Sequence, residues 1–470
     1  MDKKKTISRR KFIGTTSCAA VGYTTLFSSL LNLKAFEAAA LDNSMLMPTD
    51  GYRALVCLML GGGNDSYNML IPMGAPYADY QVTRSNLAIP SGDLLPIDPL
   101  NTPGSSFGIH PSMPEVKALF DAGKIGFVAN VGSMVQPTTR EQFQSGTHPL
   151  PLGLFSHSDQ AQQWQTGRPD ERSATGWGGR MSDLIQSMNT NENISMNISL
   201  SGTNIFQRGQ ETIEFAISSQ GSLGIAGYGN DWIGNELRTQ AIDNMLDQSY
   251  ADIYKNTYVN TIRQSRDASI EFQEAIDAVP EFDHQFANYE LSERFRMIAK
   301  TIAARETLGF QRQIFFVNYD GWDHHDEVLE NQAGMLAEVS AALGDFNAVM
   351  EELEVSECVT TFSISDFART LTSNGNGTDH AWGGNAFFMG GANVNGGNMF
   401  GSYPSLAQGF GNPLDLGDGT LIPTTSAAEY LAELGLWFGV SPSQVDEIFP
   451  SLANFYDTSS PDLPLGFLNL

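Results

Sequence analysis

Residues 53–68, RALVCLMLGGGNDSYN, set the architecture that the rest of the sequence extends. The first half, Arg53–Leu60, is short and almost continuously apolar, and it ends at three glycines, Gly61–Gly63. An apolar run of this length beside turn residues is typical of a strand that is buried on both faces. The polar residues after the glycines would then stand at the carboxyl end of that strand.

Four further runs repeat this apolar signature: Lys124–Val131, Ile194–Leu200, Gln313–Tyr319 and Cys358–Ile364. Segments with helical periodicity alternate with them or follow them: Glu115–Ala122, Leu291–Leu308, Val328–Leu353, Ser426–Phe438 and Pro442–Ile448. This alternation predicts an α/β fold, in which a mostly parallel sheet is sandwiched by helices. Residues 204–289 are first Gly/Ser-rich and then polar with helical character, so we expect a mainly helical cap inserted into a single domain, 41–470.

The first 40 residues have the order of an export signal. A basic start precedes an apolar run from Cys18 to Leu33, and small residues follow at Ala38–Ala40. The pair Arg9 and Arg10 indicates the twin-arginine pathway, which exports proteins already folded. We therefore expect a periplasmic or secreted protein; the alternative is a basic arm that contains two arginines by chance. No other stretch approaches the roughly 20 apolar residues of a membrane span.

The charge balance excludes two classes of partner. The sequence has 26 Lys+Arg against 53 Asp+Glu, and residues 1–40 hold seven basic and two acidic ones, so the mature chain would carry 19 against 51, near −32. Such a charge repels nucleic acid and anionic lipid surfaces. An anionic substrate would need a local positive site, and a metal ion is one way to provide it.

Acidic residues follow three of the predicted strands, and two histidines lie close behind. Asp65, Asp323 and Asp366 come after the runs that begin at residues 53, 313 and 358, while His325 and His380 follow the second and third of these. Because the carboxyl ends of parallel strands line one crevice, these side chains are expected to converge. Mixed oxygen and nitrogen ligands suit zinc, manganese and similar ions, and an open position would allow hydrolysis.

Each of these residues also has a purely structural interpretation. Asp65 could accept backbone N–H groups in a turn. Asp323 and His325 could be surface residues at a helix entry, and His380 could face solvent from a loop. Arg369 follows an acid at a strand end. A role as a buried ion-pair partner and a role as a substrate clamp explain it equally well.

The segment Leu154–Gly167 adds a candidate for the nucleophile or for an anion contact. Ser156, His157 and Ser158 precede a helical run, and the unpaired N–H groups at a helix start favour a negative group. Helix capping by one of the serines is the alternative.

Several blocks of sequence resemble a known family: SRRKF, LVCLMLGGGNDSYNMLIP, GIHPSMPEVKALFDAGKIGFVANVGS, SHSDQAQQWQTG, GWGGR, YDGWDHHDE, ISDFARTLTSNGNGTDHAWGG and GLWFGV. They are similar, in this order, to the exported bacterial family called domain of unknown function 1501, of the alkaline phosphatase/sulfatase superfamily. The resemblance implies one metal site with Asp323, His325 and His380. It implies a second with Asp65, Asp366 and a nucleophile from Ser156–Ser158, with Arg369 nearby.

Two features depart from that superfamily. Phe367 stands where its two-metal members usually have His, which implies that the second ion is absent or is a hard, oxygen-bound ion such as Ca²⁺ or Mg²⁺. No cysteine in Leu154–Gly167 offers a formylglycine, and the spacing to Gly167 puts His157, or Ser156 one residue away, at the nucleophile position. Attack on the ester by an activated water is the alternative to a nucleophilic side chain.

We therefore expect an exported hydrolase of phosphate or sulfate esters that depends on one or two divalent ions, Zn, Mn, Ca or Mg. Its substrate would be an anionic ester, either a small molecule or a polysaccharide. The alternative from another class is a non-catalytic, metal-containing binding or cell-surface protein on the same scaffold. A headgroup transferase with the same site is a third interpretation.

Overall fold

The computed structural model describes residues 51–229 and 234–470, and the predicted export signal lies outside them. The described chain forms a ten-stranded sheet in the order β12-β5-β11-β10-β1-β9-β6-β7-β8, with β13 beside β5. The strands are β1 Arg53–Gly61, β5 Ile125–Gly132, β6 Asn197–Ser199, β7 Phe215–Ser218, β8 Gly221–Ser222, β9 Arg312–Asp320, β10 Val359–Ser365, β11 Gly384–Met389, β12 Met399–Gly401 and β13 Thr425–Ser426.

The centre of the sheet is parallel, as the sequence predicts. The first strand, β1, lies between β9 and β10 and pairs in parallel with both. Its end is in register with theirs, since Leu60 faces Ser365 and Gly61 faces Asp320. Within the described part of this sheet, β11 and β8 run antiparallel to their neighbours. All five predicted strands are confirmed as β1, β5, β6, β9 and β10, although β6 is shorter than expected.

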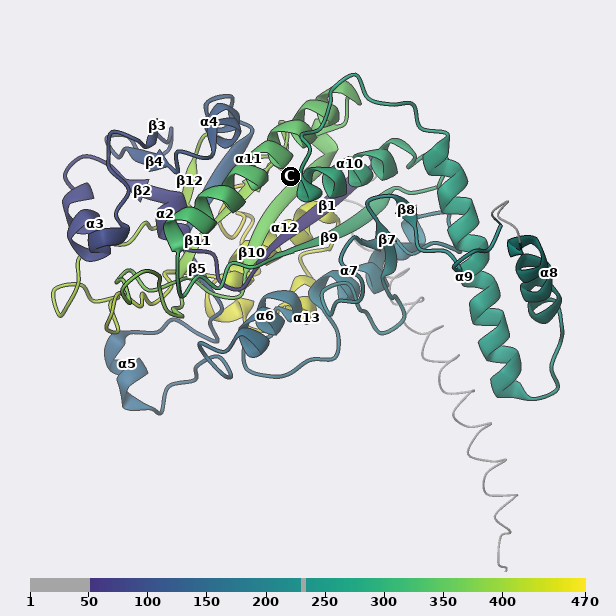
Figure 1. The fold of residues 1–470 in the computed structure, drawn as a ribbon. Helices are drawn as coiled ribbons and strands as arrows, with labels where there is room; N and C mark the ends of the chain where they lie inside the picture. The colour runs from purple at the N-terminus through teal and green to yellow at the C-terminus, as the bar shows by residue number, and fades with distance from the viewer. Residues whose placement is uncertain (1–50, 230–233) are drawn as a thin grey trace, which may run out of the picture. The chain divides into compact units, whose positions relative to one another are not determined.

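Helices cover both faces of the sheet, which confirms the predicted layers (Figure 1). One face carries α4 Pro114–Asp121, α10 Glu290–Ala303 and α11 Val328–Glu352. The other carries α6 His157–Thr166, α7 Trp177–Ile185, α12 Ala427–Phe438 and α13 Val445–Ile448. The remaining helices of the described chain are α2 Ser66–Met69, α3 Tyr77–Arg84, α5 Arg140–Ser145, α8 Asn235–Leu246 and α9 Ile253–Asp277. None of the described helices is long and apolar enough to cross a membrane.

Two regions contain more strands than the sequence predicts. A small antiparallel sheet orders β2 Leu70–Pro72, β4 Phe107–Ile109 and β3 Leu95–Ile97 as β2-β4-β3. Strands of three residues are too short to show periodicity, which explains why they were not predicted. Residues 204–289 contain α8 and α9, as well as β7, which joins the main sheet beside β6. That this segment acts as a cap stays a prediction.

The glycine turn after β1 brings three segments into direct contact. Gly62 and Gly63 have positive φ angles of 114° and 92°, which side chains rarely tolerate. A Cβ on Gly62 would lie 2.6 Å from the backbone nitrogen of Asp323, and one on Gly63 would lie 2.7 Å from the Phe367 ring. The turn therefore packs on the segments that follow β9 and β10, and only glycine leaves room for this approach.

This packing predicts a large cost for a single methyl group. Gly63→Ala should lower the free energy of unfolding by about 1–2 kcal/mol for the backbone conformation, plus about 1–3 kcal/mol for overpacking. Gly104→Ala is the matched control, because Gly104 has a similar φ of 87° and open space around its Cβ position. Denaturant unfolding of both variants measures the difference. Equal losses would show that the close approach does not contribute.

Candidate metal centre

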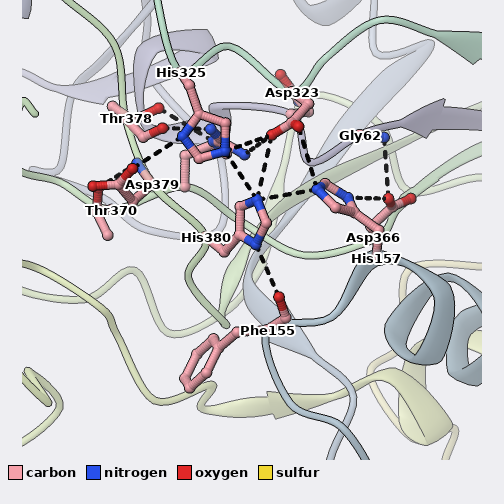
Figure 2. A network of polar contacts seen from close by, with 12 residues as sticks. Gly62, Phe155, His157, Asp323, His325, Asp366, Thr370, Thr378, Asp379 and His380 are labelled. Atoms are coloured by element: carbon pink, nitrogen blue, oxygen red, sulfur yellow. Dashed lines mark hydrogen bonds and ion pairs between the residues drawn. The ribbon is translucent and has the colours of Figure 1, made fainter.

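The carboxyl edge of the parallel strands carries a cluster of histidines and aspartates (Figure 2). Asp323 and His325 lie in the loop after β9, and His157 is the first residue of α6. His380 comes from the chain after β10, which folds back so that Arg369 and His380 form an antiparallel bridge. The ligand atoms of His157, Asp323 and His380 all lie within 4.8 Å of one another.

The Nε2 atom of His380 lies between those of the other two histidines. The Nε2 of His380 lies 3.0 Å from that of His157 and 3.1 Å from that of His325. The Asp323 carboxylate completes the group, 3.1 Å from His325 Nε2 and 3.4 Å from the Nε2 atoms of His157 and His380. His157, Asp323 and His380 thus form the compact group, and His325 adjoins two of its members but lies outside the set whose ligand atoms are all within 4.8 Å of one another.

The Nδ1 atom of each ring has an acceptor, and these acceptors assign the tautomers. His157 Nδ1 lies 2.8 Å from Asp366 Oδ2, and His325 Nδ1 lies 3.0 Å from Asp379 Oδ1. His380 Nδ1 lies 2.9 Å from the carbonyl oxygen of Phe155. A neutral ring that donates from Nδ1 leaves a bare lone pair on Nε2. Lone pairs and a carboxylate at these distances repel one another unless a proton or a metal cation lies between them.

Arg369 orients Asp323. Its Nη1 donates to Asp323 Oδ1 at 2.6 Å, while Nε and Nη2 donate to the hydroxyl and the carbonyl of Thr378. Burial alone would raise the pKa of Asp323, but the ion pair with Arg369 and the nearby histidines outweigh it, and the pKa is lowered. The guanidinium is fully buried and each of its nitrogens is engaged. Arg369 is therefore the buried ion-pair partner, one of its two predicted roles.

Asp366 stands behind His157, and it faces the ring rather than the point where the Nε2 atoms meet. Its Oδ2 accepts from His157 Nδ1 and from the backbone N–H of Gly62 at 3.2 Å. Burial raises the pKa of this carboxyl, although its two donors oppose the shift. The Phe367 ring packs on His157 and His380, with ring centroids 4.7 and 4.6 Å away. Asp366 thus orients the ring of a candidate ligand.

The structure does not bring Asp65 to the cluster. Asp65 and Arg84 are both 0% exposed, and their side chains form an ion pair. The backbone carbonyl of Asp65 accepts from Gln332 Nε2 at 2.7 Å. A carboxylate with no exposure needs a charged partner, and the predicted second metal site loses this ligand to Arg84.

The two serines flank His157 without touching the cluster. Ser156 is the N-cap residue of α6, but its side chain makes no capping hydrogen bond. The hydroxyls of Ser156 and Ser158 lie 3.2 Å apart. Of the three nucleophile candidates, only His157 reaches the cluster, and it does so as a candidate ligand.

Two contributors were not predicted. Asp379 precedes His380 directly, and a carboxylate beside an imidazole is a signal that could have indicated its role. Phe155 contributes through its backbone carbonyl, for which a side-chain pattern carries no signal.

Imidazoles that bind a metal through one nitrogen almost always donate the other N–H to a carboxylate or carbonyl. All three Nδ1 atoms have such an acceptor here, so this donor set fits a cation held by Nε2 of His157 and His380 and by Asp323, with His325 beside them. Fold and site together define the class: an α/β protein with a candidate metal centre at the carboxyl edge of its sheet.

This chain belongs to the family described as Protein of unknown function (DUF1501), whose family model matches residues 52–449. The family indicated by the sequence blocks is therefore confirmed. No curated protein matches the chain.

Several solved structures are similar to part of the chain. Ps i-CgsB in complex with k-i-k-neocarrahexaose is 10% identical with a TM-score of 0.37, covering 86% of this chain and 77% of that one. The PsFucS1 sulfatase from Pseudoalteromonas sp. is 9% identical with a TM-score of 0.34, covering 88% and 72%. The soluble domain of lipooligosaccharide phosphoethanolamine transferase A from Neisseria meningitidis is 11% identical with a TM-score of 0.31, covering 86% and 93%. TM-scores this low carry no argument about the present chain.

The buried pair predicts that Asp65 matters for stability and not for metal retention. Asp65→Ala should lower the free energy of unfolding by about 3–5 kcal/mol, because Arg84 is left buried without a counter-charge. Its metal content after purification should equal that of the wild type. The double variant Asp65→Leu/Arg84→Met is the control and should recover much of the stability. Loss of the metal from folded Asp65→Ala would instead return Asp65 to the ligand set.

Proposed function

We propose that this protein is an exported, metal-dependent hydrolase of phosphate or sulfate esters. The observation that carries the proposal is the convergence of the Nε2 atoms of His157 and His380 with the Asp323 carboxylate, with His325 Nε2 beside the latter two. The resemblance of the sequence to the alkaline phosphatase/sulfatase superfamily supports the reaction class, and the twin-arginine pattern supports export to the periplasm or beyond.

The chemistry of the donors favours a borderline ion such as Zn²⁺. Imidazole nitrogens and one carboxylate suit zinc and related transition metals, whereas Ca²⁺ and Mg²⁺ prefer oxygen ligands. Such an ion, when bound, polarises an ester oxygen and lowers the pKa of water. Asp366 is committed to His157 and Asp65 to Arg84, so the cluster supports one ion rather than two.

Charges around the cluster favour singly charged esters. Three carboxylates touch the ligand set, namely Asp323, Asp366 and Asp379, and one guanidinium, Arg369, opposes them. A divalent ion would balance the two remaining negative charges and leave the site neutral. A neutral site offers less attraction to a dianionic phosphate monoester than a positive one does. Sulfate esters and phosphodiesters, with one charge each, suit the site better.

One observation favours the alternative, a non-catalytic metal-containing binding protein. Arg369 is 0% exposed, and each of its three nitrogens donates to Asp323 or Thr378, so the guanidinium does not face a space that a substrate can enter. Neither Ser156 nor Ser158 contacts the cluster. Turnover by the metal-loaded protein distinguishes the two functions.

Removing one ligand should release the ion. Asp323→Ala and His380→Ala should each contain far less than one zinc per chain after refolding or export in zinc-supplemented medium, measured by elemental analysis. His284→Ala is the matched control, because His284 pairs with Asp345 at 2.8 Å, outside the cluster. Wild-type metal content in both cluster variants would refute the proposed centre.

Zinc-loaded protein should hydrolyse an aryl sulfate or a bis-aryl phosphodiester with a higher kcat/KM than the matching aryl phosphate. The expected preference is roughly tenfold, about 1.4 kcal/mol in the transition state. His380→Ala should abolish both reactions. A faster reaction with the dianion would contradict the charge argument, and no turnover by protein that holds its metal would favour the binding function.

A further inference from the structure

Phe155 has a backbone conformation that bulky residues seldom adopt. Its φ angle is +73°, in the left-handed region, and it lies two residues before α6 begins at His157. Aromatic residues reach this region only where surrounding contacts hold them there. Such strain is often kept because it places a backbone group where a site needs it.

Contacts on both sides of Phe155 hold this conformation. Its N–H donates to Gln160 Oε1 at 2.5 Å, and its carbonyl accepts from His380 Nδ1 at 2.9 Å. Gln160 is fully buried in α6, three residues after His157. The Phe155 ring packs against the small apolar cluster of Met134, Trp382 and Ile422. The ring and the side chain of Gln160 thus fix the direction of one carbonyl.

We propose that Phe155 and Gln160 are positioning residues for the metal ligand His380. Gln160 holds the strained backbone of Phe155, and the Phe155 carbonyl holds the proton of His380 on Nδ1, so that Nε2 faces the cluster as a lone pair. This inference rests on the proposed metal-dependent function. Helix α6 would then have two roles. It supplies the candidate ligand His157, and its first turn fixes the candidate ligand His380.

Loss of the Gln160 acceptor should act through this chain of contacts. The unpaired N–H of Phe155 would favour relaxation to a negative φ, and its carbonyl would turn away from His380. The His380 ring would then lose the acceptor that selects its tautomer. A neutral ring with its proton on Nε2 must take up a proton on Nδ1 and lose the one on Nε2 before Nε2 binds an ion.

Gln160→Leu tests the first link, with Gln163→Leu as the matched control. Gln163 is also a buried glutamine of α6, and its Nε2 donates to the carbonyl of Leu152 at 2.6 Å. Chelator competition with Zn²⁺ should show affinity roughly 10–100-fold weaker for Gln160→Leu and within about threefold of wild type for Gln163→Leu. Equal losses in the two variants would overturn the proposal.

Phe155→Gly and Phe155→Ala test the second link and keep the proposal testable if Gln160→Leu does not fold. Both variants remove the ring, and they differ only in the methyl group that disfavours positive φ. Zn²⁺ affinity should be retained better by glycine than by alanine, by roughly tenfold. An alanine variant that binds as tightly as the glycine variant would refute a role for the strained backbone.

Nitrogen-15 NMR of histidine-labelled, metal-free protein gives a readout that needs no ion. His380 should be protonated on Nδ1 in the wild type and Gln163→Leu, and should become a mixture of tautomers in Gln160→Leu. An unchanged tautomer in Gln160→Leu would overturn the positioning role. If wild-type protein bound no Zn²⁺ while Gln160→Leu still changed the His380 tautomer, the proposed function would fail and the positioning role would stand.

Discussion

The parallel pairing of β9, β1 and β10 is the constraint on which the candidate site depends. Because all three strands run in the same direction and end in register, the residues after them leave the sheet at one edge. The glycine turn after β1 then lets the segments that carry Asp323 and Asp366 approach it closely. Hydrophobic burial of the strands on both faces therefore brings together, at one edge of the sheet, polar groups that lie far apart in the sequence.

Much of this arrangement could be predicted from the sequence, because long buried strands leave a clear apolar pattern. The same logic indicated that Asp323, His325 and His380 would lie at one edge, where the structure brings them together. Asp65 shows the limit of that logic. Its position after β1 is equivalent to theirs, yet the sequence does not reveal that Arg84, on a short helix of the same region, forms an ion pair with it.

The contacts that give the cluster its chemical character were harder to foresee. Two carboxylates and one backbone carbonyl determine where the three imidazoles carry their protons. Asp366 was expected to be a ligand, but its carboxylate faces Nδ1 of the candidate ligand His157. The role of the Phe155 carbonyl depends on a backbone angle, and residue types alone do not encode it.

The same central pairing has a consequence for synthesis of the chain. Arg53 of β1 pairs with Arg312 of β9, which the ribosome adds 259 residues later. At elongation rates of about 5–20 residues per second, β1 waits roughly 10–50 s before its first partner strand exists. During that interval an apolar strand with both edges open is exposed to aggregation. Nascent chains of this protein should therefore depend on a chaperone that shields their first strand until translation passes residue 320.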